Sequence, residues 1–110
     1  PETAAIAEAP ARLHDDLTQD ELVYTHLVRA TDIDMGRHMN NVVYIRLLLD
    51  CFSAKTLASG SIKSIEAHYA SPCLEGETLG VFCRREDRLC RMAVRHADGR
   101  AAVLAQIVFG

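Results

Sequence analysis

The chain lacks tryptophan and has only three phenylalanines and three tyrosines among its 110 residues. Its 12 lysines and arginines are outnumbered by 15 aspartates and glutamates, which gives a formal net charge of −3. Nucleic-acid binding requires a basic field for the phosphates and, for single strands, aromatic side chains on which bases stack. Because the chain has no basic excess and few aromatic side chains, we expect no nucleic-acid partner.

Closely spaced cysteine pairs are also missing. Cys51, Cys73, Cys83 and Cys90 include no two cysteines separated by two residues, the spacing that zinc ribbons require. Four reduced thiols are the simplest interpretation. Cys51, Cys83 and Cys90 fall in apolar segments, where cysteine behaves as a small core residue.

The sequence also contains no complete metal motif. Asp32, Asp34 and Gly36 resemble the start of a calcium-binding loop, but the twelfth position is Val43, where a bidentate glutamate is needed. A site built from the two aspartates and His38 lacks a convincing fourth ligand. We therefore predict no metal and no cofactor.

No apolar run is long enough to span a membrane. The longest is interrupted by Arg46 and Asp50. The chain begins at Pro1, with neither an initiator methionine nor the pattern of a signal peptide, which indicates a processed end or a fragment boundary. A cytoplasmic location with no membrane partner is the default expectation.

One buried helix is predicted for 42–57, where apolar residues leave almost no polar face. Such a helix must be surrounded on most sides. Asn40 or Asn41 can cap its N-terminus, and Ser59-Gly60 can end it.

Five strands are predicted around this helix. Apolar and β-branched residues, in places alternating with polar ones, indicate strands at 22–30, 62–70, 78–85, 89–97 and 100–109. Residues 85–88 and Asp98-Gly99 read as hairpin turns. We therefore predict an α+β domain over 21–110, with a largely antiparallel five-stranded sheet around the long helix. Residues 1–20 show no periodicity and read as an N-terminal tail or linker.

Polar groups gather just before the predicted helix. Asp34, His38, Asn40 and Asn41 fall within eight residues. A carboxylate there can activate water or attack a carbonyl, and the N–H groups at the start of a helix can stabilise a developing oxyanion. This arrangement suits an attack on a carbonyl group.

The same residues carry a family resemblance. Asp32-Ile33-Asp34, His38 and the segment 40–45 resemble the signature of the acyl-ACP thioesterases, within the hotdog-fold thioesterase superfamily. The likeness continues more loosely through 62–66, Tyr69, Gly76 and the last two strands, and covers about 22–109. It is a likeness to the C-terminal hotdog of two-hotdog chains, so it implies a single-hotdog relative or one half of such a chain.

The resemblance assigns catalysis to two residues. Asp34 matches the aspartate that serves hotdog thioesterases as general base or nucleophile, and His38 matches the histidine that acyl-ACP thioesterases add to it. The family usually has asparagine where this chain has Gly36, and glutamate near the position of Pro72. These two departures remove a carboxamide and a carboxylate that the family is thought to use for positioning water.

Five further residues are candidates for substrate binding: Asn40, Asn41, Val42, Tyr44 and Cys73. The first three lie at the expected helix N-terminus, where capping is the simplest role for the asparagines. Tyr44 lies one turn further, where a packed ring with a bonded hydroxyl is the simpler interpretation. Cys73 follows Pro72 in a loop, which predicts a thiol more accessible than the other three, although a structural role is the simpler one.

We therefore predict a homodimeric or homotetrameric hotdog protein that hydrolyses an acyl-ACP or acyl-CoA with Asp34. The pairing of exposed sheet edges supplies a dimerisation surface. Two alternatives stay open. One is a non-catalytic module that binds acyl thioesters or mediates oligomerisation, which the residues at positions 36 and 72 favour. The other is a hotdog dehydratase acting on 3-hydroxyacyl thioesters.

Overall fold

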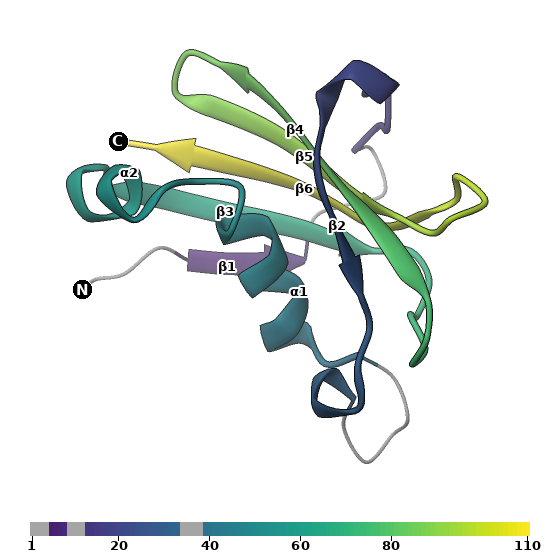
Figure 1. The fold of residues 1–110 in the computed structure, drawn as a ribbon. Coiled ribbons are helices and arrows are strands. Elements are labelled where there is room, and N and C mark those ends of the chain that lie inside the picture. Colours follow the sequence, from purple (N-terminus) through teal and green to yellow (C-terminus); the bar gives the residue numbers. More distant parts are fainter. Residues whose placement is uncertain (1–4, 9–12, 34–38) are drawn as a thin grey trace.

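The computed structural model describes residues 5–8, 13–33 and 39–110. Within these residues, six strands form one sheet with the order β1-β3-β6-β5-β4-β2, and α1 lies against one of its faces (Figure 1). In chain order the elements are β1 (Ala5–Glu8), the 3-10 turn η1 (Gln19–Glu21), β2 (Leu22–Leu27), the 3-10 turn η2 (Ala30–Asp32), α1 (Asn41–Leu49), α2 (Ala54–Ser59), β3 (Ile62–Tyr69), β4 (Thr78–Glu86), β5 (Leu89–Arg95) and β6 (Ala101–Phe109).

The five predicted strands are all present, and their turns explain the antiparallel order. Strands β4, β5 and β6 pair in sequence, joined at the two predicted hairpin turns. Asp87 and Gly99 have positive φ values of 59° and 93° there, the conformation that tight hairpin turns require. Strand β3 pairs with β6 rather than β4, and β2 pairs with β4 at the edge. The predicted α+β architecture is confirmed.

A sixth strand lies in the segment where we expected no regular element. β1 pairs in parallel with β3, with Ala5 opposite Ser64 and Glu8 opposite Ala67. A four-residue strand is too short to reveal an alternating pattern, and here the pairing with β3 defines it. The expectation of an irregular tail was therefore wrong for these residues, while the domain boundary near residue 20 stays a prediction.

Residues 13–18 are also fastened to the sheet. The Arg95 guanidinium donates hydrogen bonds to the Asp15 carboxylate, at 2.7 and 2.5 Å, and to the Leu17 carbonyl at 2.6 Å. Leu17 packs with Phe82 and Leu104 on the face of the sheet opposite α1. The segment therefore covers part of the outer face.

The predicted single helix is two shorter helices. α1 ends at Leu49, with Asp50 as its C-cap, and α2 begins after Ser53, whose side-chain oxygen accepts a hydrogen bond from Thr56 N–H. A serine in this position satisfies the first amides of a new helix, so it favours a break that hydrophobicity alone does not reveal. The expectation of one helix over 42–57 was therefore wrong in length.

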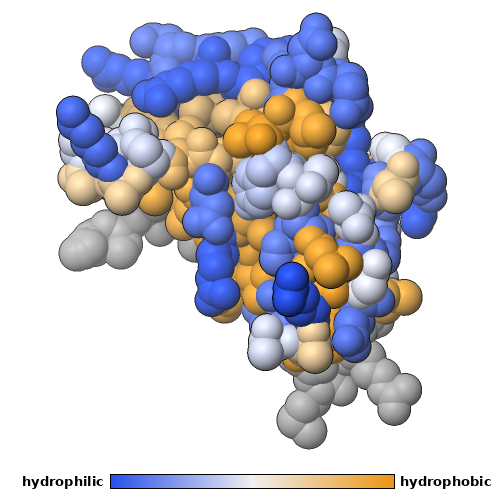
Figure 2. All heavy atoms as spheres, viewed as in Figure 1, coloured by the Kyte–Doolittle hydropathy of each residue, from blue (hydrophilic) through white to orange (hydrophobic). Residues whose placement is uncertain are grey.

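The buried side of α1 forms the centre of the core. Val43, Tyr44, Leu47 and Leu48 are buried against the face of the sheet that carries residues such as Met92 and Val94. The opposite side of the helix faces outward, and Val42 there is 68% exposed. Apolar patches, interrupted by hydrophilic residues, lie around β2 and α1, whereas hydrophilic atoms cover the β4–β5 hairpin end (Figure 2). α1 is therefore covered on one side only.

Asp32 holds the connection from β2 to α1. Its carboxylate accepts hydrogen bonds from His26 Nε2 at 2.8 Å and from the Arg29 backbone N–H at 3.0 Å, and its backbone carbonyl accepts one from Asn40 N–H. Burial raises the pKa of this carboxyl, but the hydrogen bonds from Arg29 and His26 outweigh it and hold the pKa below its ordinary value. Asp32 therefore closes this turn, and its pairing with His26 was not predicted.

Among the described residues, none of the helices has both the length and the apolar character to cross a membrane.

Truncating a side chain on the buried side of α1 tests the core. We expect Leu48→Ala to lower the free energy of unfolding by about 2–5 kcal/mol, because Leu48 is fully buried and its loss leaves a cavity. Val42→Ala, on the exposed side of the same helix, serves as the control and should change it by less than about 0.5 kcal/mol. Urea denaturation followed by circular dichroism measures both, and equal effects would contradict the assigned burial.

The Asp32 hydrogen bonds predict a pH-dependent contribution to stability. Asp32→Asn should destabilise the protein by about 1–3 kcal/mol at pH 7, because it removes a charged acceptor from two part-buried hydrogen bonds. The native pKa is depressed, so this contribution is fully present above about pH 5 and is lost as the pH falls below about 3.9 and through the native value. Urea titrations of both proteins from pH 7 to pH 3 measure it. Asp20→Asn, an exposed position in η1, is the control.

Candidate functional site

The two predicted catalytic residues, Asp34 and His38, lie outside the described residues, as does Gly36. Their roles therefore stay predictions. The chain on either side of them is described. Ile33 and Met39 form an antiparallel bridge, and Asn40 follows directly as the N-cap of α1. The chain therefore leaves and re-enters the described structure beside the N-terminus of this helix.

Asn40 acts as the helix cap that its sequence position predicts. Its side-chain oxygen accepts a hydrogen bond from Val43 N–H at 3.1 Å, and its carbonyl accepts one from Tyr44 N–H. Asn41 and Val42 form the exposed start of the first turn. The first amides of a helix have no acceptor within it and form the positive end of its dipole. This end of α1 therefore suits a developing negative charge.

An open pocket of about 390 Å³ lies beside this helix end. Its volume falls in the range of small-molecule sites, which run from about 300 to 1,000 Å³. The lining combines residues from the start of α1, the end of β3 and the loop after it: Met39, Asn41, Tyr44, Tyr69, Ala70, Ser71 and Pro72. Two predicted substrate-binding residues, Asn41 and Tyr44, thus lie at one pocket.

Tyr44 joins α1 to the loop after β3. Its hydroxyl accepts a hydrogen bond from the Cys73 backbone N–H at 3.1 Å, and the Cys73 carbonyl accepts one from Met39 N–H at 3.2 Å. The ring packs against Tyr69 with centroids 5.8 Å apart. Burial raises the pKa of the Tyr44 hydroxyl. The packed ring with a bonded hydroxyl, the simpler interpretation of this residue, is what the structure shows.

Cys73 is less accessible than its loop position suggested. The residue is fully buried, whereas Cys51 and Cys83 are only partly buried, so the expectation of a more accessible thiol was wrong. The Cys73 backbone is bonded to the Tyr44 hydroxyl and to Met39 N–H, which holds this part of the loop beside α1. Burial raises the pKa of its thiol, which disfavours the reactive thiolate. Its predicted contact with substrate stays a prediction.

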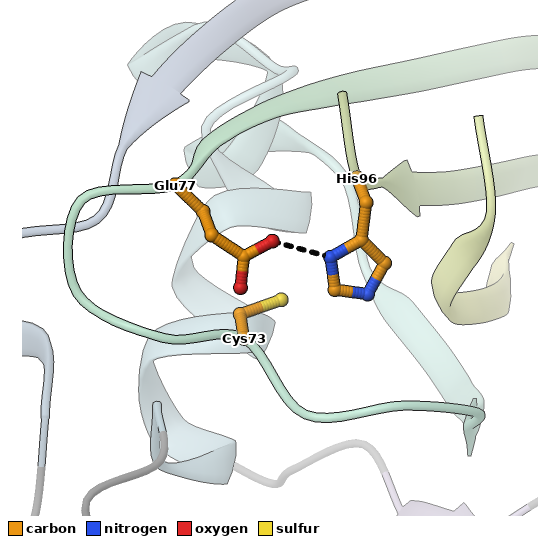
Figure 3. Close-up of side chains that lie close together, drawn as sticks. All are labelled: Cys73, Glu77 and His96. Carbon is orange, nitrogen blue, oxygen red and sulfur yellow. Dashed lines mark hydrogen bonds and ion pairs between the residues drawn. The ribbon is translucent and has the colours of Figure 1, made fainter. Parts of the chain in front are cut away.

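Sequence reasoning missed a hydrogen-bonded chain of three side chains beside the pocket. Glu77 Oε1 lies 2.6 Å from His96 Nδ1, and His96 Nε2 lies 2.7 Å from Ser71 Oγ. Figure 3 shows the Glu77 carboxylate facing the imidazole, with the Cys73 sulfur beside them. His96 is buried, and Ser71 is half-buried at the pocket wall. We call Ser71, His96 and Glu77 the Ser71 chain.

Glu77 is held as a carboxylate. Burial raises the pKa of its carboxyl. The hydrogen bonds from His96 and from the Leu74 backbone N–H, the latter at 2.7 Å, lower it by more and leave the pKa below its ordinary value. A carboxylate can only accept hydrogen bonds. Nδ1 of His96 therefore carries a proton and donates a hydrogen bond to Glu77.

The contact between Glu77 and His96 could have been predicted from the register of the β4–β5 hairpin. With Asp87 and Arg88 as the turn, Gly80 lies opposite Arg95, so the residue after Arg95 lies near the start of β4, close to Glu77. Alternation then places His96 on the same face as Met92 and Val94, toward α1. Ser71 could not be found in this way, because its loop pairs with no strand.

Cys73, Glu77 and His96 also bring three types of metal-ligand atom within 4.8 Å of one another. A metal ion bound through Nδ1 would have to displace the proton shared with Glu77. Nε2 faces Ser71 instead. The hydrogen bonds of the described residues thus account for the arrangement, and the sequence-based prediction of no metal stays a prediction.

Comparison with known structures places the fold. Residues 15–109 match the model of the acyl-ACP thioesterase C-terminal domain. An acyl-ACP thioesterase from Bacteroides thetaiotaomicron is similar at a TM-score of 0.82 and 24% identity, over 94% of this chain and 42% of that one. The 12:0-ACP thioesterase from Umbellularia californica is similar at 0.74 and 19%, over 88% of this chain and 38% of that one.

A shorter protein has the same fold. The SAV2348 protein of Staphylococcus aureus, solved in complex with CoA, gives a TM-score of 0.71 at 17% identity, over 81% of this chain and 74% of its own. No curated protein sequence matches the chain. The chain spans less than half the length of the two acyl-ACP thioesterases above. The fold is the predicted hotdog, and with 95 of its 110 residues inside the matched range, the chain belongs to the acyl-ACP thioesterase C-terminal domain family.

Proposed function

We propose that this protein hydrolyses an acyl thioester to a free carboxylic acid and a thiol. The observation that carries the proposal is the pocket at the N-terminus of α1, where Asn41 and Tyr44 face the loop that holds Ser71. The family match and the acyl-ACP thioesterases of the same fold support it.

Asp34 is the proposed general base, because the segment that contains it joins the described chain beside this pocket. It activates a water molecule for attack on the carbonyl, and His38 hydrogen-bonds to it or to the substrate. The backbone N–H groups of Asn41 and Val42 stabilise the oxyanion. One such donor is typically worth about 2.7–4 kcal/mol.

The proposed substrate is an acyl-ACP or an acyl-CoA. The acyl chain would lie along the apolar residues of the pocket, such as Met39 and Tyr69, with the pantetheine arm leading outward. We further propose a homodimer or homotetramer in the cytoplasm. Val23 and Leu27 support it, because both are about half exposed on β2, the strand at one edge of the sheet.

Thiol release from a panel of acyl-CoA and acyl-carrier-protein thioesters tests this proposal. We expect turnover by the unaltered chain and a loss of at least about 100-fold in Asp34→Ala, because a general base contributes about 10²–10⁴-fold. Asp20→Ala, an exposed acidic position away from the pocket, should keep full activity.

Circular dichroism and size-exclusion chromatography confirm that the compared proteins share fold and oligomeric state. Product analysis separates the alternatives. An enoyl thioester would indicate a dehydratase, and saturable binding without turnover would indicate a binding module.

A further inference from the structure

We propose that Cys73, Glu77 and His96 together bind one Zn²⁺ ion. This inference goes beyond the proposed hydrolysis and does not depend on it. The three residues come from the loop after β3, from the position before β4 and from the position after β5, and their side chains point toward one another (Figure 3). The prediction of no metal was made from spacing along the chain, and spacing does not reveal ligands that separate segments bring together.

The donor atoms match the chemistry of zinc. A thiolate, an imidazole nitrogen and a carboxylate oxygen are the ligand types that Zn²⁺ takes in proteins, whereas Mg²⁺ and Ca²⁺ bind oxygen atoms. One such atom from each of Cys73, Glu77 and His96 lies within 4.8 Å of the other two. Tetrahedral zinc places its ligand atoms about 3.3–3.6 Å apart. Small side-chain rotations reach that spacing, and they include opening the 2.6 Å contact between Glu77 Oε1 and His96 Nδ1.

His96 and Glu77 have the outer hydrogen bonds that metal ligands need. A ligating histidine donates its other ring N–H to a neighbour, and a ligating carboxylate is hydrogen-bonded in turn. His96 Nε2 lies 2.7 Å from Ser71 Oγ, which lies 3.0 Å from the Ala101 carbonyl. With zinc on Nδ1, Nε2–H donates to Oγ and the Ser71 hydroxyl donates to that carbonyl. Glu77 Oε2 accepts a hydrogen bond from Leu74 N–H at 2.7 Å, which leaves Oε1 for the ion.

The backbone of Cys73 is held on both sides. Its N–H donates a hydrogen bond to the Tyr44 hydroxyl, and its carbonyl accepts one from Met39 N–H. Burial raises the pKa of the Cys73 thiol, but a thiol that coordinates a metal ion loses its proton outright. Zinc binding therefore releases the thiol proton, while the imidazole stays neutral because its proton moves from Nδ1 to Nε2.

The charges of the site balance. The Cys73 thiolate and the Glu77 carboxylate together neutralise Zn²⁺, and a neutral site is far less costly to bury than an unpaired charge. Arg100 is the cation that acts on both of these ligands. Its guanidinium is paired with the Asp98 carboxylate at 2.8 Å. The pairing offsets its repulsion of the ion.

Solvent reaches the three ligands at Glu77. Its side chain is 29% exposed, whereas the His96 side chain is 4% exposed and Cys73 is fully buried. The ion enters past this carboxylate, and a water molecule completes the four ligands. Bound zinc then links β4 and β5 to the loop that contributes residues 70–72 to the pocket wall. Its role is to hold that wall in place.

Titration of the tag-free chain with Zn²⁺ and Co²⁺ tests the site. After treatment with a chelator, isothermal calorimetry should show one Zn²⁺ bound per chain, and Co²⁺ should give the intense near-ultraviolet band of a thiolate–cobalt bond. Cys73→Ala should abolish that band. Cys73→Ala and His96→Gln should each weaken zinc binding by at least about 100-fold, more than the loss of an outer partner. Cys90→Ala, at another fully buried cysteine of the same core, is the matched control and should leave both results unchanged.

Two further variants separate metal binding from folding. Ser71→Ala removes the outer partner of His96 and should weaken zinc binding about 10–100-fold while the cobalt band remains. Glu77→Gln changes one atom of a partly exposed side chain, so it keeps the test decisive if the variants at buried positions do not fold. Zinc should raise the Tm of the unaltered chain, because it binds the folded state, and should leave that of Glu77→Gln unchanged.

Three outcomes would overturn the proposal. The first is an unaltered chain that takes up no Zn²⁺. The second is zinc binding with no thiolate–cobalt band, and the third is binding that folded Glu77→Gln leaves unchanged, because both place the ion on other residues. None of these measurements uses a thioester, so their failure and the failure of the proposed hydrolysis are distinguishable.

Discussion

The burial of one side of α1 against the sheet is the constraint on which the rest of the structure depends. Leu47 and Leu48 anchor the helix on the inner face, and this fixes where its N-terminus lies. The Tyr44 hydroxyl then ties that end of the helix to the backbone of Cys73. The pocket exists because a helix end, a strand end and a loop are held together by these contacts.

At the C-terminal end of β5, two adjacent residues make contacts on opposite faces of the sheet. Arg95 and His96 are neighbours in sequence, yet they serve opposite sides of the sheet. Arg95 holds residues 15–17 on the outer face, with its guanidinium 4.2 Å from the centre of the Phe82 ring. His96 joins the Ser71 chain on the inner face. The residue that forms the ion pair with Asp15 therefore directly precedes the one that carries the imidazole.

The elements that short sequence patterns determine were predicted from the sequence. Alternation and turn chemistry located β4, β5 and β6, and a capping asparagine located the start of α1. The break at Ser53 was missed because the apolar residues continue through it, and β1 was missed because only its partner defines it. The Ser71 chain joins a loop to two strands, so no single stretch of sequence contains it. Asp34 and His38 were predicted from the motif and the resemblance, and their roles stay predictions.

The parallel pairing of β1 with β3 has a consequence for how the chain behaves at high concentration. β3 is a long strand with apolar residues such as Ile62 and Ile65, and without β1 its backbone donors and acceptors would form an open edge. Open apolar edges recruit strands from other molecules and promote aggregation. Those four residues therefore cover this edge of the sheet, and their removal would expose the β3 edge to strands of other molecules.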